Sequence, residues 1–204
     1  MTDVLPEHLI TLSPEAQAQL FTEARTANTF TDQPVDDAQL RAIFDLVKYP
    51  PTAMNIQPLR VLFVRPGSGR DRLLTHVAEG NRAKTATAPV VAVLAADTDF
   101  HEHLDTVFPI RPGMREHFAG DPAGREQMAR FNAGLQVGYF LLGVRAAGLA
   151  AGPMGGFDTA GVDKEFFADT GWKSLLLVNI GHPGPDAWYP RLPRLGYDDV
   201  ARHA

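Results

Sequence analysis

The stretch Tyr49-Pro50-Pro51-Thr52-Ala53-Met54-Asn55-Ile56-Gln57-Pro58 says more about the fold of this chain than any other segment. Its prolines fix the backbone angle φ and remove hydrogen-bond donors, so the segment forms a rigid loop. An alcohol and two amides lie between the prolines, and a rigid loop presents such groups at set positions. The loop is therefore either a stiff connector or part of a ligand site.

The flanks of this loop predict a helix before it and a strand after it. Asp36 and Gln39 resemble a capping box, and four apolar residues after them follow helical spacing: Leu40, Ile43, Phe44 and Val47. These signals predict a helix that stops before Pro50. The run 61–64 is continuously apolar between turn residues, as in a buried strand.

The rest of the chain continues the alternation of strands and helices. Buried strands are predicted at 89–96 and 174–180, and helices at 13–25, 70–79, 125–147 and 158–168, with a loop-rich insert at 98–122 and a helical turn in the tail. This pattern predicts an α+β domain whose central mixed sheet is flanked by helices. We expect a mobile N-terminal arm over residues 1–12 and a single domain over 13–204.

A second unusual segment is Gly152-Pro153-Met154-Gly155-Gly156-Phe157-Asp158. Adjacent glycines allow positive φ and let a flat ligand approach the main chain, but a plain turn would look the same. A third feature is a set of separated basic residues: Arg25, Lys84, Arg191 and Arg194. The forked guanidinium group of arginine suits a phosphate, although each of these residues alone could be an ordinary surface residue.

Composition excludes several classes of protein. The net charge is −5, and no local cluster of Lys and Arg indicates nucleic-acid binding. The absence of cysteine excludes disulfides, thiolate nucleophiles and Cys-type metal sites. The longest apolar run, 131–144, is too short to span a bilayer, and the N-terminus lacks a secretory pattern, so we expect a cytoplasmic protein.

Four ordered segments together resemble the nitroreductase family over nearly the whole chain. They are Arg25-Thr26-Ala27-Asn28, the loop 51–58, the glycine-rich segment 152–158 and Arg191 near the C-terminus. The sequence motifs ARTxN, PTxxNxxP, GPMxGFD and YxRLPR are most similar to those of the RutE/HadB-like branch. The resemblance implies a nitroreductase-like fold, an intertwined homodimer and FMN at the subunit interface.

The resemblance also implies roles for single residues. Arg25, Thr26, Asn28 and Arg191 would face the FMN phosphate and ribityl chain, with Asn81 and Lys84 at the pyrimidine edge. Met154, Gly155 and Gly156, after Pro153, would lie along the isoalloxazine, and the partner subunit would supply Pro51, Thr52, Ala53 and Asn55. Two positions depart from the family, since many members have a basic residue at position 28 and Glu at position 155.

The implied activity is ping-pong hydride transfer through flavin N5, from NADH or NADPH to a small acceptor. The branch implies a malonic semialdehyde reductase of pyrimidine degradation, whose substrate carboxylate needs a cation such as Arg111 or Arg115. A broad nitro, quinone or enal reductase is the alternative, and a flavin-binding protein without turnover is another. A metal site at His101-Glu102-His103, with Asp99 and His117, is a further alternative, but its spacing fits no metalloprotease helix.

Overall fold

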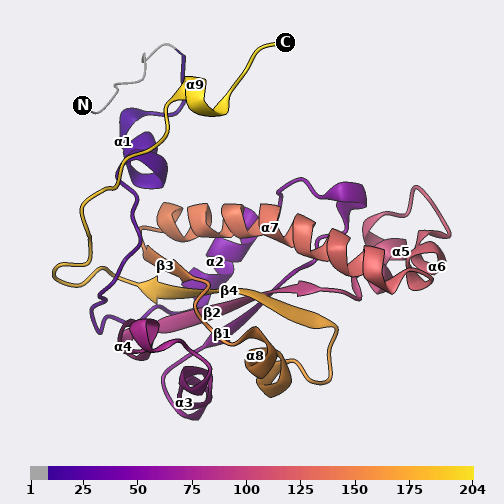
Figure 1. Ribbon diagram of the computed structural model, residues 1–204, viewed down its shortest axis with the longest axis horizontal. Coiled ribbons are helices and arrows are strands. Elements are labelled where there is room, and N and C mark those ends of the chain that lie inside the picture. Colours follow the sequence, from indigo (N-terminus) through magenta and orange to yellow (C-terminus); the bar gives the residue numbers. More distant parts are fainter. Residues whose placement is uncertain (1–8) are drawn as a thin grey trace.

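The computed structural model describes residues 9–204, and a four-stranded sheet forms its centre (Figure 1). The strands are β1 (Leu59–Val64), β2 (Val90–Asp97), β3 (Ala150–Met154) and β4 (Trp172–Gly181), in the order β1-β2-β4-β3. All pairings among these strands are antiparallel. The expectation of a mixed sheet was therefore wrong for this part of the chain.

The connections explain the antiparallel order. Between β1 and β2 the chain forms two successive helices that contact each other, α3 (Ser68–Thr75) and α4 (Glu79–Thr87), and so returns to the end of the sheet where β1 finished. A parallel neighbour would need a crossover to the opposite end. The sequence predicted one helix at 70–79 and missed α4.

Helices cover both faces of the sheet. Figure 1 shows α2 (Asp37–Val47) and α7 (Pro122–Ala146) on one face, with α3, α4 and α8 (Thr159–Phe166) on the other. The alternation of side chains along β2 serves both layers. Val90, Ala92 and Leu94 join the core under α2 and α7, whereas Val91, Val93 and Ala95 join the opposite core. This two-sided burial explains why β2 is a continuous apolar run.

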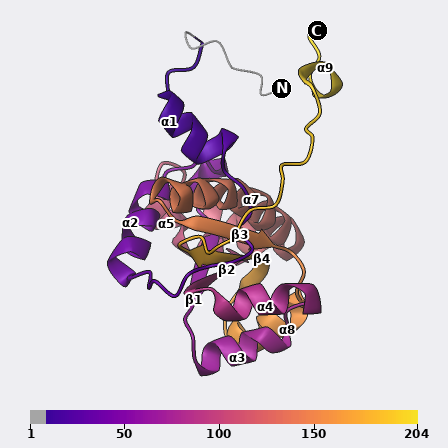
Figure 2. The same cartoon turned by 90° about the vertical axis from the view of Figure 1, so that its left-hand side faces the viewer.

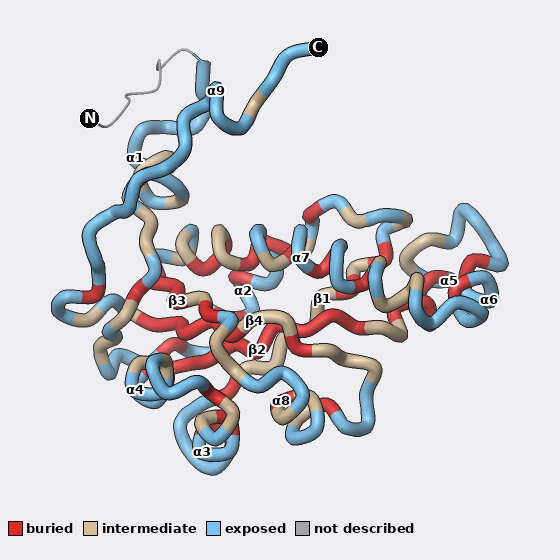
Figure 3. The backbone as a smooth tube through the Cα atoms, viewed as in Figure 1, coloured by how far each residue is buried: buried red, intermediate tan, exposed pale blue. Residues whose placement is uncertain are grey.

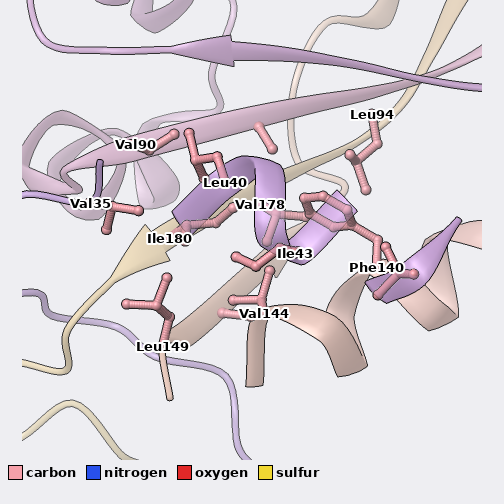
Figure 4. Packing of buried hydrophobic residues seen from close by; sticks show 13 residues of the cluster. Val35, Leu40, Ile43, Val90, Leu94, Phe140, Val144, Leu149, Val178 and Ile180 are labelled. Atoms are coloured by element: carbon pink, nitrogen blue, oxygen red, sulfur yellow. The ribbon is translucent and has the colours of Figure 1, made fainter. Parts of the chain in front are cut away.

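Side chains from the sheet and from helices α2 and α7 together fill the core between them. In Figure 4 the side chains of Leu40 and Ile43 from α2 and of Phe140 and Val144 from α7 converge on the strands. Helix α7 begins at an Asp121 side-chain cap followed by proline, three residues before the predicted start. No helix among residues 9–204 has the length and apolar character needed to cross a membrane.

The segments near the two chain ends lie outside the layers of helix and sheet. Figure 2 shows α1 (Pro14–Gln17) and α9 (Tyr197–Val200) on the α7 side of the molecule, and Figure 3 shows that the C-terminal segment is almost wholly exposed. The N-terminal part also contains the π-helical turn η1 (Ala18–Thr22). The predicted arm, residues 1–12, lies largely outside the described residues.

The insert carries more helix than the sequence predicted. It contains η3 (Phe100–His103), α5 (Leu104–Val107) and α6 (Met114–Ala119), which enclose a small core with the start of α7. A short 3-10 turn, η2 (Ala53–Asn55), lies in the proline-rich loop before β1.

Candidate functional site

A cavity of about 340 Å³ lies between the segment after η1 and the C-terminal segment. We call it the arginine cavity, and its lining includes four of the residues that the sequence predicted for one phosphate-binding end: Arg25, Thr26, Asn28 and Arg191. Arg145 and Arg194 complete the set of arginines around it. The segment after η1, the end of α7 and the C-terminal segment thus bring four arginines together.

Reciprocal hydrogen bonds hold the two sides of the arginine cavity together. Arg25 donates from Nη1 to the Tyr189 carbonyl at 3.4 Å, while Arg191 donates from Nη2 to the carbonyls of Ala24, at 3.1 Å, and Thr22. The Ala27 N–H donates to the Ala151 carbonyl at 3.1 Å. The cavity is therefore attached to the start of β3.

The charge of the arginine cavity is largely uncompensated within residues 9–204. Arg25 has an exposed ion pair with Glu23 at 3.4 Å, and the other three arginines have none. The Nε atoms of Arg25 and Arg145 are buried without an acceptor. Burial, and then the charge of Arg191, lowers the pKa of Arg145. Several guanidinium groups with free donors form a site suited to an anion such as a phosphate monoester.

The opposite end of β3 lies against α4. Asn81 Nδ2 donates to the Gly156 carbonyl at 3.3 Å, and Thr85 Oγ1 contacts Met154 Sδ at 3.4 Å. A Cβ on Gly156 would lie 2.6 Å from Asn81 Nδ2, whereas one on Gly155 would meet nothing within 4 Å. The main chain at Gly155 is therefore open to a ligand. Lys84 is half-buried on the same helix.

A buried arginine that the sequence did not single out holds α4 in place. The Arg70 side chain donates to the carbonyls of Thr85 (2.6 Å) and Ala88 (2.9 Å), near the end of α4, and to that of Val64 (2.7 Å). Burial lowers its pKa to about 10, so the group is still cationic at neutral pH. Arg70 therefore ties the helix that carries Asn81 and Lys84 to the end of β1.

The proline-rich loop is held by two polar side chains of α7. The Ala53 N–H donates to Asn132 Oδ1 at 2.8 Å, and the Leu59 N–H donates to Gln136 Oε1 at 2.8 Å. Both α7 residues are buried. Two amides four residues apart in an otherwise apolar helix were the signal that could have predicted this support.

Backbone strain is concentrated in the same loop. Four non-glycine residues in the described range have positive φ, and three lie here: Met54, Asn55 and Gln57. Such conformations persist where the surroundings impose them, and they cluster at functional sites. Meanwhile Pro51, Ala53 and Asn55 are exposed, and Thr52 is partly so. The loop is thus rigid and turned outward.

Within one chain the proline-rich loop does not reach the arginine cavity. Asn132, which holds Ala53, and Arg145, which lines the cavity, are thirteen residues apart on α7. At a rise of about 1.5 Å per residue they are separated by about 20 Å. The structure therefore gathers Arg25, Thr26, Asn28 and Arg191 but leaves the loop apart from them.

The residues predicted in the insert are not gathered at these sites. Arg111 lies on an exposed turn, and Arg115 is paired with Glu102, whose hydrogen bonds and charge raise the pKa of Arg115. His101 is buried, with Nε2 at 2.9 Å from Arg125 Nη1. Residues 9–204 contain no group of three or more His, Cys, Asp or Glu side chains suited to a metal.

Comparison with known proteins identifies a matching family model. Residues 22–182 match the model of the nitroreductase family. A protein of Streptomyces coelicolor with the provisional name NADH dehydrogenase/NAD(P)H nitroreductase is 60% identical over 184 residues, which cover 90% of this chain and 91% of that protein.

Solved structures show the same fold at low sequence identity. A provisionally named nitroreductase of Exiguobacterium sibiricum, solved in complex with FMN, has a TM-score of 0.79 and 20% identity, covering 96% of this chain and 98% of that one. An enone reductase of gut-bacterial fatty acid saturation metabolism has a TM-score of 0.78 and 15% identity, covering 94% and 98%. The expectation of a nitroreductase-like fold is confirmed.

Proposed function

The chain belongs to the nitroreductase family, and on that premise we propose that it is an FMN-dependent oxidoreductase that uses NADH or NADPH to reduce a small acceptor. The observation that carries this proposal is the arginine cavity at one end of β3 together with the open main chain at its other end. A relative bears the name NAD(P)H nitroreductase, and a protein of the same fold was solved with FMN.

The residues present fit an FMN laid along β3. Its phosphate would lie in the arginine cavity, where Arg25 and Arg191 offer charge-assisted donors. Its ring would lie at Met154, Gly155 and Gly156, where a missing side chain leaves space. The five residues of β3 span about 17 Å, at about 3.3 Å per residue. When bound, FMN supplies the redox chemistry, passing a hydride between nicotinamide and acceptor.

The chain's own contribution at the ring end is position and charge. Asn81 and Lys84 come from one helix, which Arg70 fastens to β1, so their positions relative to β3 are fixed. A cation at the pyrimidine edge of a flavin stabilises the electron-rich reduced form. We assign that role to Lys84 and assign Asn81 to the polar edge beside it.

We also propose that the enzyme is a homodimer, and the exposed face of α7 supports this. Phe131 is 70% exposed, Leu135 43% and Tyr139 44%, at helical spacing on one face. Gly134 and Gly138 lie on that face, and a Cβ on either would meet nothing within 4 Å. These glycines therefore serve no close packing inside the chain, and a second backbone could approach there.

The dimer would complete the site. The loop bearing Pro51, Thr52, Ala53 and Asn55 is rigid, outward-facing and about 20 Å along α7 from the arginine cavity of its own chain. We propose that it covers the flavin bound by the other copy. We propose that the two subunits are intertwined through the C-terminal segment. It exposes large apolar side chains suited to covering a partner: Leu192, Leu195, Tyr197 and Val200.

The acceptor has two candidates. The name of the Streptomyces relative and the enone reductase of the same fold favour a broad reductase of nitro groups, quinones or activated alkenes. Malonic semialdehyde is the narrower candidate. It needs a cation for its carboxylate, and Arg111 is the better placed of the two predicted residues because Glu102 already neutralises Arg115.

Two measurements test this proposal in turn. An absorbance spectrum of the purified protein should show flavin, either at once or after addition of FMN. Protein that stays colourless and takes up no FMN would reject the proposed function. Comparison of kcat/KM for malonic semialdehyde, a quinone and a nitroarene then separates the acceptors. A preference for the aldehyde that is lost in Arg111→Ala would select the narrower candidate, and a preference for the other two would exclude it.

A further inference from the structure

Arg145 was not among the predicted site residues, yet it lines the arginine cavity from the last turn of α7. Its Nη1 donates to the Leu20 carbonyl at 3.2 Å, and its Nε is buried without an acceptor. It has no ion pair with any residue of the range 9–204. A partly buried guanidinium with an unused donor and no counter-charge is stabilised by an anion that joins it.

Repulsion from other cations nearby adds to the need of Arg145 for an anionic partner. Arg145 and Arg191 lie close enough for the charge of Arg191 to lower the pKa of Arg145, after the larger effect of burial. Two neighbouring guanidinium groups repel each other unless a negative group lies between them. A doubly charged phosphate monoester would satisfy both, because each fork can donate to separate phosphate oxygens.

The neighbouring side chains leave this role open. Asn28 is neutral, and its Nδ2 already donates to the Thr26 carbonyl at 3.2 Å. The Nη1 of Arg194 donates to the carbonyls of Leu192 and Pro193, within its own turn. Arg145 instead reaches the cavity from a long, well-packed helix, so its position is fixed before any ligand arrives.

We propose that Arg145 binds the phosphate monoester of the cofactor, together with Arg25 and Arg191 of the same cavity. This inference rests on the proposed function, since the phosphate is that of FMN. It makes α7 part of both ends of the site: its middle supports the proline-rich loop, and its last turn holds the phosphate. The alternative is that Arg145 only fastens η1 to α7 through the Leu20 carbonyl.

The test compares FMN with riboflavin, which has the same ring and ribityl chain but no phosphate. Equilibrium binding of each flavin to flavin-free protein is measured for the wild type, Arg145→Ala, Arg145→Lys and Arg72→Ala. Arg72 is an exposed arginine on α3 and lines none of the cavity, so its loss removes the same charge elsewhere.

We expect Arg145→Ala to weaken FMN binding at least tenfold, equivalent to about 1.4 kcal/mol, and to leave riboflavin binding within twofold. Arg145→Lys should recover part of the FMN affinity, and Arg72→Ala should change neither. Unchanged riboflavin binding also shows that the variant is folded.

Two results would overturn the inference. One is FMN affinity within twofold of wild type in Arg145→Ala, and the other is an equal loss for both flavins, which means a structural role. If Arg191→Ala loses FMN while Arg145→Ala does not, the proposed function stands and the role of Arg145 falls. Wild-type protein that binds no FMN overturns both.

Discussion

The arginine cavity and the proline-rich loop are the two polar features that the sequence singled out most clearly, and the structure treats them differently. The arginine cavity lies between two segments of one chain, with Arg25 and Arg191 each donating across to the other side. The proline-rich loop is equally well supported, by Asn132 and Gln136, but its support directs it outward. The arginine cavity is formed within one chain, whereas the proline-rich loop faces away from it and is largely exposed.

In the proposed dimer, this difference would divide the site between identical subunits. A phosphate needs fixed charges, and a single chain can supply them. The proposed flavin ring would need a cover on the side away from β3, because a Cβ on Gly155 meets nothing within 4 Å there. The exposed stripe on α7 lies on the helix that joins the two features, so a dimer formed there would bring the loop of one copy toward the cavity of the other.

Blocking the stripe on α7 should have the largest effect. In Gly138→Glu the new side chain meets open space within its own chain and favours helix, so the subunit should fold. A carboxylate would, however, be buried in the proposed dimer contact. We expect a monomer by light scattering and FMN affinity at least a hundredfold lower, or about 2.8 kcal/mol.

The control for this change is Ala160→Glu, which places the same side chain on exposed α8, at the opposite face of the sheet. It should keep both the oligomeric state and the FMN affinity of the wild type. A Gly138→Glu protein that remains dimeric would remove α7 from the interface.

Loss of the Arg191 guanidinium should have the second-largest effect. Arg191→Ala removes a guanidinium that lines the arginine cavity and joins its two sides, so FMN affinity should fall at least tenfold, about 1.4 kcal/mol. The protein should remain a dimer, which separates this change from the previous one. Titration of flavin-free protein with FMN measures the effect, and unchanged affinity would reject the role of Arg191.

Removing the support of the loop should have a smaller effect on binding and a measurable one on stability. Asn132→Leu leaves the part-buried Ala53 N–H without its acceptor, and loss of such a hydrogen bond costs about 1 kcal/mol. Denaturant unfolding of the flavin-free protein measures this loss. Glu126→Gln, which breaks an exposed ion pair with Arg130 on the same helix, should change stability by about 0.5 kcal/mol or less. Equal stability of Asn132→Leu and the wild type would show that the loop is held by other contacts.

The smallest effect is expected in the insert. Arg115→Gln removes an exposed pair with Glu102, and such pairs contribute about 0–1 kcal/mol. Since Arg115 lines neither feature, FMN affinity should stay within twofold. A large loss of FMN affinity would mean that the insert reaches the flavin in the assembled enzyme.

The sequence predicted those parts of the fold whose signal is local. Helix α2 follows from its apolar spacing and Asp36 cap, and β2 from its apolar run. Strand β3 was missed because Ala150-Ala151-Gly152-Pro153-Met154 has the composition of a turn, and only pairing with β4 makes it a strand. The sheet was expected to be mixed because strand direction depends on connections, and α4 was not seen.

The residues of the candidate site likewise fall into those with a local sequence signal and those without one. Residues in recognisable segments, such as Arg25 and Gly156, could be proposed from order and spacing alone. Arg145 and Arg70 could not, because an arginine at a helix end or within a polar helix is usually a surface residue. Only tertiary structure shows that one lines a cavity and the other is 2% exposed.

The central claim is that each flavin site combines the arginine cavity of one chain with the proline-rich loop of another. Mixed dimers test it most directly. One chain carries Arg25→Ala and Arg191→Ala, and the other carries Ala53→Glu, which puts a carboxylate at an exposed position of the loop. Each homodimer should bind FMN weakly, because both of its sites are damaged. The mixed dimer has one site with both defects and one with neither. We predict one FMN per mixed dimer at wild-type affinity, whereas a mixed dimer that binds no FMN at that affinity would contradict the claim.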